Sequence, residues 1–324
     1  MANSSPIRIL TVGTGAVGSI YSWRLAQTCE VTTVCRSNYQ AVLDHGFEIV
    51  SPKFGNGVFK PHHVVRTVEE AKAFGPFDFI VVTLKALLDV YDTGEIIAPA
   101  VEEGKTTIVL IQNGFGVEPP IVKRFPKNPL VSVVAYIGAN QVGPGKVEMK
   151  AFEYLRVGTY RGCTVDSEAA CTLFKECLTK GGVQVDPVDD IEEARWEKLF
   201  WNGAFNPVCA ILRLDTTQVM ENEAALGIVR RLIHEYTATA SAATKKEYNA
   251  EEVFDNIIKM TANGAPNYKP SMQLDIERQQ PMEVEVIVGT AVRSAKEHGV
   301  NVPTLEMLRE LLGAMNIHHL KSQL

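Results

Sequence analysis

A glycine-rich turn near the N-terminus limits the possible folds more than any other feature of the sequence. The apolar run 7–12 leads into a stretch with helical character through Gly13-Thr14-Gly15-Ala16-Val17-Gly18. Between a strand and a helix, Gly13 makes a tight turn, Gly15 lets a diphosphate approach the backbone, and Gly18 allows close helix–strand packing. Free N–H groups at the start of the helix attract phosphates. We predict that residues 13–18 bind a dinucleotide; a glycine turn without a ligand is the alternative.

The end of the second apolar run indicates which dinucleotide is bound. Sites for NAD usually place Asp or Glu there to bond the ribose 2′-hydroxyl. Here the run 31–35 is followed by Arg36, Ser37 and Asn38, with no acidic residue. A guanidinium suits a 2′-phosphate, and Ser37 or Asn38 can add hydrogen bonds. We therefore predict NADP(H), with an ordinary surface arginine as the alternative for Arg36.

Short β-branched runs alternate with helical stretches in the first half of the chain, a pattern typical of a parallel sheet with crossover helices. Two further runs predict strands that complete the sheet or add an antiparallel edge. A last short strand is predicted at 183–185. The predicted strands are 7–12, 31–35, 79–84, 106–111, 130–136, 147–152, 154–159 and 183–185.

The β signal nearly disappears from about Ile191 onward, and helical periodicity replaces it. The predicted helices are Ile191–Leu212, 222–246, 251–261 and 282–297, with a Gly-, Pro- and Asn-rich loop at 263–271. Segment 186–190 reads as a linker. The fold class is therefore α/β, with a Rossmann-type doubly wound sheet in residues 1–189 and an all-helical substrate domain in residues 190–324.

Composition excludes several classes of partner. The 324 residues carry a formal net charge of −6 and no block of Lys or Arg, so nucleic acid and anionic membranes are not expected partners. The six scattered cysteines read as reduced, mostly buried thiols. No histidine stands at metal-ligand spacing, so no metal is expected. The N-terminal residues lack a secretory signal pattern, which favours the cytoplasm. A homodimer and a monomer both fit the helical second half.

Two later strand ends also carry polar residues. Lys85 follows the run 79–84, and Gln112-Asn113-Gly114 follows 106–111. Ligands of such sheets bind beyond the carboxyl ends of the strands. The shared location favours a cofactor contact over a surface lysine for Lys85, and over an ordinary turn for Asn113.

Helix Ile191–Leu212 carries the clearest chemical signal of the second half. Lys198, Asn202 and Asn206 recur every four residues and share one face among aromatic and aliphatic neighbours. One amine and two amides are costly to bury unless they meet polar partners, and a bound substrate can provide them. A solvent-facing stripe is the alternative.

Ser271 and Glu283 each have a structural explanation. Pro281 is well placed as a first helical residue, which puts Glu283 near the third position, where a carboxylate favours the helix N-terminus. Ser271 is in a position to cap a helix. Spacing alone leaves both explanations open.

Taken in order, these features resemble the ketopantoate reductase family across nearly the whole chain and both predicted domains. The resemblance rests on Gly13–Gly18, Arg36, Lys85, Gln112-Asn113-Gly114, Lys198-x-x-x-Asn202-x-x-x-Asn206-Pro207, Ser271-Met272 and Glu283 through Gly289. The Lys-Asn-Asn-Pro helix together with the Ser-Met…Glu segment is specific. The Lys-x-x-x-Asn part is shared with β-hydroxyacid dehydrogenases.

The resemblance implies a role for each matching residue in the substrate site. Lys198 matches the family's proton donor to the ketone oxygen. Asn202 and Asn206 match amides that bind substrate, and Ser271 matches the hydroxyl that holds the substrate carboxylate.

For the cofactor, the resemblance implies contacts from the turn 13–18, Arg36 and Lys85. Asn113 matches a residue that touches both cofactor and substrate, and Ala139 a backbone contact near the nicotinamide. Glu283 matches a carboxylate linked to the cofactor ribose and to substrate.

The function implied is NADPH-dependent reduction of a 2-oxo acid, most simply 2-dehydropantoate to pantoate in pantothenate biosynthesis. Two departures bear on substrate identity. Residues 213–217 replace an Asn-Gly common in the family, and Pro270 replaces a serine often found before the Ser-Met pair. The alternatives are a reductase of another branched 2-oxo acid such as 2-ketoisovalerate, and a non-catalytic NADP(H)-sensing regulatory protein.

Overall fold

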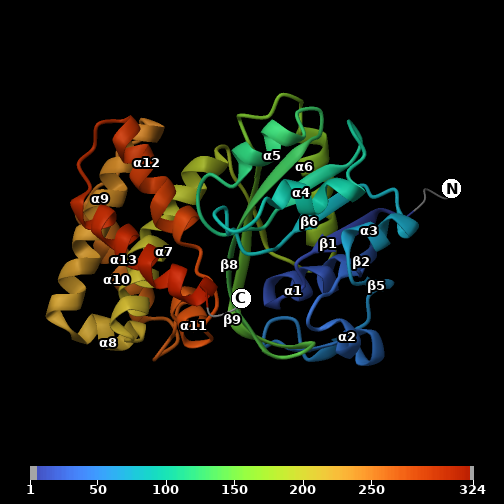
Figure 1. Cartoon of the computed structure of the whole chain (residues 1–324), viewed down its shortest axis with the longest axis horizontal. Helices are drawn as coiled ribbons and strands as arrows, with labels where there is room; N and C mark the ends of the chain where they lie inside the picture. The colour runs from blue at the N-terminus through green and yellow to red at the C-terminus, as the bar shows by residue number, and fades with distance from the viewer. Residues whose placement is uncertain (1–5, 322–324) are drawn as a thin grey trace. The chain divides into compact units, whose positions relative to one another are not determined.

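The computed structural model describes residues 6–321 and divides into two compact units (Figure 1). The N-terminal unit holds the described residues up to Lys85, together with Asp92–Gln112 and Val117–Ile191. The C-terminal unit holds Ala86–Tyr91, Asn113–Gly116 and the described residues from Glu192 onward. Two short segments of the first half of the chain therefore belong to the C-terminal unit.

A mixed ten-stranded sheet forms the centre of the N-terminal unit, in the order β4-β3-β9-β8-β7-β6-β1-β2-β5, with β10 beside β9. The part β8-β7-β6-β1-β2-β5 is parallel throughout and has the order of a doubly wound sheet, which reverses between β1 and β6. The strands are β1 Arg8–Val12, β2 Glu30–Val34, β3 Phe47–Val50, β4 Gly57–Phe59, β5 His63–Val65, β6 Phe79–Val82, β7 Thr107–Leu110, β8 Leu130–Gly143, β9 Lys146–Thr159 and β10 Val185–Pro187.

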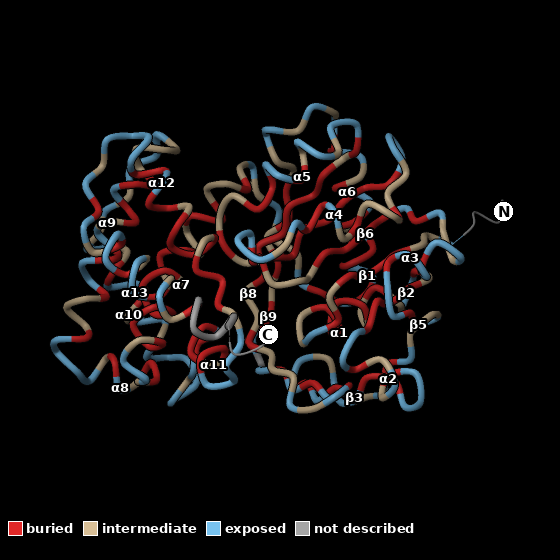
Figure 2. The backbone as a smooth tube through the Cα atoms, in the orientation of Figure 1, coloured by how far each residue is buried: buried red, intermediate tan, exposed pale blue. Residues whose placement is uncertain are grey.

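Parallel strands covered on both faces need apolar side chains at every position. The central strands β6 and β7 are buried along their full length, and Figure 2 shows the buried backbone at β6. Helices α1 and α6 pack against each other and against β9. The helices of this unit are α1 Ala16–Leu25, α2 Tyr39–His45, α3 Val68–Ala71, α4 Thr93–Ile97, α5 Glu118–Arg124 and α6 Glu168–Lys180, with short 3₁₀ turns at Lys72–Phe74 and Ala98–Ala100.

The predicted fold class is confirmed, and three details of the sheet differ from the prediction. The runs 147–152 and 154–159 form one strand, β9, which lies inside the sheet because β3 pairs with its other edge. The short strands β3, β4 and β5 were not predicted, since three or four residues give too little alternation to detect. The segment predicted as a linker begins as a strand, β10, and the boundary between residues 189 and 190 stays a prediction.

The part of the C-terminal unit that follows Glu192 is built from helices, the first of which begins one residue earlier. They are α7 Ile191–Leu212, α8 Thr216–Glu221, α9 Glu223–Thr244, α10 Ala250–Ala262, α11 Ser271–Glu277, a π-helical turn Glu285–Gly289, α12 Thr290–Glu297 and α13 Pro303–Lys321. Side chains at the starts of three helices accept hydrogen bonds from helix N–H groups: Asp215 at α8, Asn222 at α9 and Asn249 at α10. Within residues 6–321, no helix is both long and apolar enough to cross a membrane.

The prediction of α7 is confirmed residue for residue, whereas the helix predicted at 282–297 begins later. Pro281, Met282 and Glu283 precede its first helical residue, Val284. The predicted position of Glu283 in the first helical turn is therefore wrong. Ser271 is also not a cap: it is the first residue of α11, and Pro270 occupies the capping position.

Candidate active site

The glycine turn after β1 has the shape that each of its glycines makes possible. Gly13 has a φ of +100°, and a Cβ there would lie 2.5 Å from the backbone nitrogen of Leu84. A Cβ on Gly18 would collide with the Gly13 carbonyl oxygen. At Gly15, by contrast, nothing lies within 4 Å of an added Cβ. The crowded positions hold the turn against β6, and the open one leaves backbone accessible to a ligand.

Hydrogen bonds from the neighbouring strand ends hold this turn in place. The Thr14 hydroxyl donates to the Val34 carbonyl at 2.8 Å, and the Asn38 amide donates to the Thr14 carbonyl at 3.0 Å. The Thr83 hydroxyl donates to the Gly13 carbonyl. Ser37 and Asn38 were both predicted to add hydrogen bonds beside Arg36. Asn38 is buried and its NH₂ bonds the turn, whereas Ser37 is exposed.

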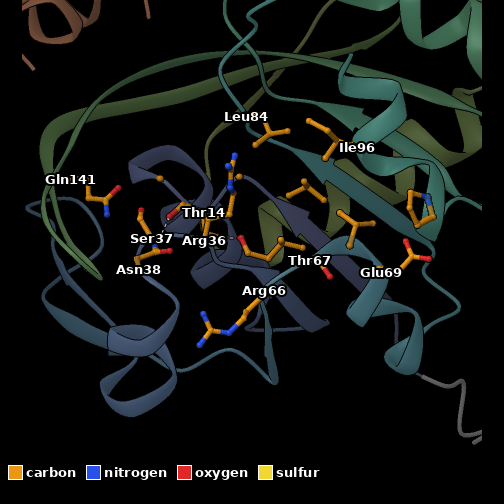
Figure 3. A pocket seen from close by; sticks show the side chains of 16 residues that line it. Thr14, Arg36, Ser37, Asn38, Arg66, Thr67, Glu69, Leu84, Ile96 and Gln141 are labelled. Carbon is orange, nitrogen blue, oxygen red and sulfur yellow. Dashed lines mark hydrogen bonds between the residues drawn. The ribbon is translucent and has the colours of Figure 1, made fainter. Parts of the chain in front are cut away.

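A pocket of about 440 Å³ opens at the glycine turn (Figure 3). Its lining joins Gly13, Thr14 and Gly15 to Arg36 and to residues that follow β5 and β6. The volume lies in the range of small-molecule and cofactor sites. Helix α1 begins at Ala16 with no acidic residue in its first turn, so its N–H groups face no competing carboxylate from that turn. The open backbone at Gly15 and the helix start fit the diphosphate of a nicotinamide dinucleotide, and the Arg36 side chain belongs to the same lining.

Other predicted residues lie in the N-terminal unit, where Lys85 and Gln112 follow strands and Ala139 lies within β8. Lys85 is half-buried and lies just after β6. The Gln112 amide donates to the Leu84 carbonyl at 2.9 Å, which links the residues after β7 to those after β6. Ala139 is half-buried in β8, where a β-bulge shifts the register with β9. Bulges are common next to active sites, where they leave a residue outside the regular pairing of the strands.

In the C-terminal unit, three predicted residues form one connected group. The Lys198 amine on α7 donates to Asn113 Oδ1 at 2.7 Å. The Asn113 NH₂ donates to Glu283 Oε2 at 3.3 Å, and Glu283 Oε1 accepts from the Ala86 N–H at 2.8 Å. Glu283 is only 8% exposed. One amide therefore bridges a buried carboxylate and a lysine amine.

The surroundings of Lys198 lower its pKa to about 8, from an ordinary value of 10.5. Desolvation by burial is the main cause, the positive charge of Arg195 adds to it, and the carboxylate of Glu283 acts in the opposite direction. Such an amine is mostly protonated at neutral pH and is a stronger acid than an exposed lysine. Both properties suit a proton donor.

Sequence reasoning gave no role to Arg195. This arginine is 2% exposed, and its guanidinium donates to the Gly114 carbonyl at 2.9 Å. It lies three residues before Lys198 on α7, so the two side chains share a helical face. The spacing of Arg195 and Lys198 in the sequence indicates that their charges interact, but it does not indicate that the guanidinium is buried.

The rest of the predicted polar stripe is present on α7. Asn202 is half-buried, and Asn206 is 2% exposed with no hydrogen-bond partner for its Oδ1 among the described residues. A buried amide oxygen without a partner costs free energy unless a ligand or water bonds it. Ser271 is exposed at the start of α11, and among residues 6–321 no hydrogen bond or ion pair joins it to Lys198, Asn113 or Glu283.

A π-helical turn that begins two residues after Glu283 contacts the segment Asn113–Gly116. The Phe115 N–H donates to the Val286 carbonyl at 2.9 Å, and a Cβ on Gly114 would overlap the Val286 side chain. The Tyr236 hydroxyl from α9 donates to the Ile287 carbonyl at 2.8 Å. Single π-helical turns occur frequently at functional sites. This turn, which the sequence did not predict, fixes the backbone on both sides of the Asn113–Glu283 hydrogen bond.

Comparison with known protein families matches almost the whole chain. Residues 9–162 match the model described as ketopantoate reductase PanE/ApbA, and residues 190–316 match the model for the C terminal of the same family. The chain belongs to the ketopantoate reductase family. The resemblance carried by the glycine turn, the Lys-Asn-Asn helix and the Ser-Met…Glu segment is thereby confirmed.

Relatives of this ketopantoate reductase family member cover more than nine-tenths of the chain. A 2-dehydropantoate 2-reductase of Archaeoglobus fulgidus is 30% identical over 94% of this chain and 96% of its own length. An uncharacterised protein of Saccharomyces cerevisiae is 31% identical over 94% of this chain and 92% of its own. The crystal structure of 2-dehydropantoate 2-reductase from Geobacter metallireducens is 30% identical, with a TM-score of 0.85 over 95% of this chain and 99% of the other.

The same fold also occurs in D-mandelate dehydrogenase. Its ternary structure with NADH and anilino(oxo)acetate has a TM-score of 0.85 and 24% identity, over 97% of this chain and 99% of the other. This likeness concerns the fold alone. Family membership and fold thus agree, while the substrate has to be argued from the site.

Proposed function

We propose that this chain is an NADPH-dependent reductase that converts a 2-oxo acid into the 2-hydroxy acid, with 2-dehydropantoate as the first candidate substrate. One observation carries the proposal: a largely desolvated lysine amine, Lys198, is hydrogen-bonded to Asn113, and the same amide binds the carboxylate of Glu283. A group of this kind matches the need of carbonyl reduction, in which negative charge develops on an oxygen.

Bound NADPH would supply the hydride that forms the new C–H bond at the carbonyl carbon. The Lys198 ammonium stabilises the negative charge that develops on the oxygen and donates the proton that completes the hydroxyl. Lys198 becomes a neutral amine in that step and recovers a proton from solvent before the next turnover. Asn113 Oδ1 orients the amine, and Glu283 holds Asn113 through its NH₂ group.

The substrate assignment is supported by the polar groups of α7 and by the relatives. The Asn206 oxygen, which has no hydrogen-bond partner among the described residues, and the half-buried amide of Asn202 suit a substrate with a hydroxyl group as well as a carboxylate. We assign the substrate carboxylate to Ser271, as in the family. The named relatives favour 2-dehydropantoate, while Pro270 and residues 213–217 keep 2-ketoisovalerate as a second candidate.

A panel of 2-oxo acids, followed by the absorbance of NADPH, tests the proposal. We expect oxidation of NADPH that depends on the acid, with the highest kcat/KM for 2-dehydropantoate. Lys198→Ala should lower kcat by about a hundredfold or more, because a general acid contributes roughly 10²–10⁴-fold. Lys259→Ala, at an exposed lysine of α10, is the matched control and should leave kcat unchanged.

Two outcomes would contradict parts of the proposal. Equal kcat/KM for 2-dehydropantoate and 2-ketoisovalerate would remove the narrow substrate assignment. A second outcome is that the chain binds NADPH but reduces no acid in the panel, and that Lys198→Ala leaves NADPH binding unchanged. This outcome would favour a regulatory protein that senses NADP(H).

A further inference from the structure

A second arginine stands at the pocket of the glycine turn, and its part in the site was not foreseen from the sequence. Arg66 directly follows β5, and Arg36 lies two residues beyond β2. These strands are parallel neighbours in register at Val34 and Val65, and the Cys35 N–H bonds the Val65 carbonyl at 2.8 Å. Neighbouring strands lie about 4.8 Å apart. The sheet therefore delivers both arginines to the same edge.

Both guanidinium groups belong to exposed residues that line the pocket (Figure 3). In this view Arg36, Ser37 and Arg66 lie toward one end of the lining, and Glu69 and Ile96 toward the other. Within residues 6–321, neither guanidinium is paired with a carboxylate. Glu70 accepts from the backbone N–H of Arg66.

The acidic residue that lines this pocket has a partner of its own. Glu69 forms an ion pair with Lys72 at 2.7 Å. Neither arginine of the pocket lining therefore has a carboxylate bonded to its guanidinium among residues 6–321, and a bound anion would meet positive charge there.

Tyr39 gives Arg66 a defined position. The Arg66 guanidinium carbon lies 3.9 Å from the centroid of the Tyr39 ring, a cation–π contact. Tyr39 is the first residue of α2 and follows Ser37 and Asn38, which come directly after Arg36. A planar guanidinium stacked in this way loses little freedom when it binds a phosphate through its N–H groups.

From this geometry we infer that Arg66 forms, with Arg36, a two-arginine site for the 2′-phosphate of NADP(H), and that Tyr39 positions Arg66. The inference rests on the proposed use of NADPH and adds a residue that determines cofactor specificity. The group that this site would bind is the 2′-phosphate on the adenosine ribose. Arg66 should not increase the affinity for an adenosine nucleotide that lacks this phosphate.

Two small probes test this site without turnover. Titration calorimetry compares adenosine 2′,5′-bisphosphate with adenosine 5′-monophosphate, which differ by the 2′-phosphate. We expect wild type to prefer the bisphosphate. Arg66→Gln should reduce that preference by about tenfold, the loss typical for a hydrogen bond to a charged group, with little change in binding of the monophosphate. Arg36→Gln should act in the same way, and Tyr39→Leu should give a smaller loss.

The controls separate this inference from the proposed function. Arg161→Gln removes an exposed arginine of the same unit that pairs with Asp190, and it should leave both affinities unchanged. A preference that survives Arg66→Gln but is lost in Arg36→Gln would overturn the role of Arg66 and leave NADPH use intact. No preference in wild type would overturn both the two-arginine site and the choice of NADPH.

Discussion

Replacement of Glu283 by Gln should shift the pH dependence of reduction to lower pH. The Glu283 carboxylate is separated from the Lys198 amine by the Asn113 amide alone, and its negative charge raises the pKa of Lys198. Gln is isosteric with Glu and keeps an oxygen that accepts from the Ala86 N–H. The substitution therefore removes charge while it preserves shape and this hydrogen bond, but the Gln NH₂ faces the Asn113 NH₂ and cannot accept the hydrogen bond that Glu283 Oε2 accepts.

The size of the shift follows from the position of the charge. An opposite charge within about 4–6 Å changes a pKa by roughly 1–3, and we expect the lower end of this range because an amide intervenes. The pKa of Lys198 would then fall from about 8 to roughly 7. Since the ammonium is the active form, kcat is present at low pH and is lost as pH rises through this value. At about pH 8 the protonated fraction would fall from roughly one half to one tenth, about a fivefold loss in kcat.

Single-turnover reduction at saturating NADPH and 2-oxo acid, measured between about pH 5.5 and 9.5, isolates the step in which the proton moves. Near pH 6 both amines are protonated, so the rate of each protein should reach a plateau there; the plateau of Glu283→Gln should be the lower one, because the lost Asn113–Glu283 hydrogen bond leaves the Lys198 amine less well oriented. The pH shift is therefore read from the midpoint of each profile. Glu306→Gln, at an exposed glutamate of α13, is the control and should keep the wild-type profile. An alkaline limb at the same pH in Glu283→Gln and wild type would refute this electrostatic reasoning.

Two further predictions concern stability. In Gly203→Ala the added Cβ overlaps the buried ring of Tyr236, so the free energy of unfolding in urea should fall by about 1–3 kcal/mol. In the control Gly227→Ala the nearest neighbour lies 4.0 Å from the added Cβ, so the free energy of unfolding should rise by up to about 1 kcal/mol. Equal stability of Gly203→Ala and wild type would show that the Tyr236 ring moves aside without cost. Lys198→Met should raise the free energy of unfolding near pH 7 by about 1–2 kcal/mol. Burial holds the pKa of Lys198 in the folded state near 8, below its ordinary value of 10.5, so burying the charged ammonium costs stability at neutral and low pH. That advantage should shrink as pH rises from about 8 toward 10.5, where wild type gains stability; a variant that is less stable at pH 7, with no trend in pH, would contradict the assigned cost of the amine.

The parts of the site that the sequence predicted depend on short-range signals. The turn Gly13–Gly18 and helix α7 are each specified by residues close together in the chain. Their glycine spacing and helical periodicity could therefore be recognised from the sequence. The i, i+4, i+8 spacing placed Lys198, Asn202 and Asn206 on one helix in the same way. The fold class followed from the same periodicity, summed over many segments.

The parts that were missed depend on contacts between distant segments. Glu283 looked like a carboxylate in the first turn of a helix, but its oxygens accept from Ala86 and Asn113, more than 160 residues away in the chain. Burial of Arg195 and the π-helical turn arise from packing of α7, α9 and Asn113–Gly116. Arg66 escaped notice because β5, the strand that delivers it, has only three residues. Local patterns carry no information on such pairings.

The pKa of Lys198 reflects opposite contributions from the charges of Arg195 and Glu283. Desolvation and the Arg195 guanidinium weaken the hold of the amine on its proton, which makes proton transfer to a developing alkoxide easier. Pushed further, the same effects would leave the amine neutral at physiological pH and remove the charge that stabilises the oxygen. Glu283 opposes them through Asn113, and the resulting pKa of about 8 keeps roughly nine amines in ten protonated at pH 7. A lysine in water would be fully charged but a poorer acid, so the cost of burying this ammonium is linked to its proposed chemistry.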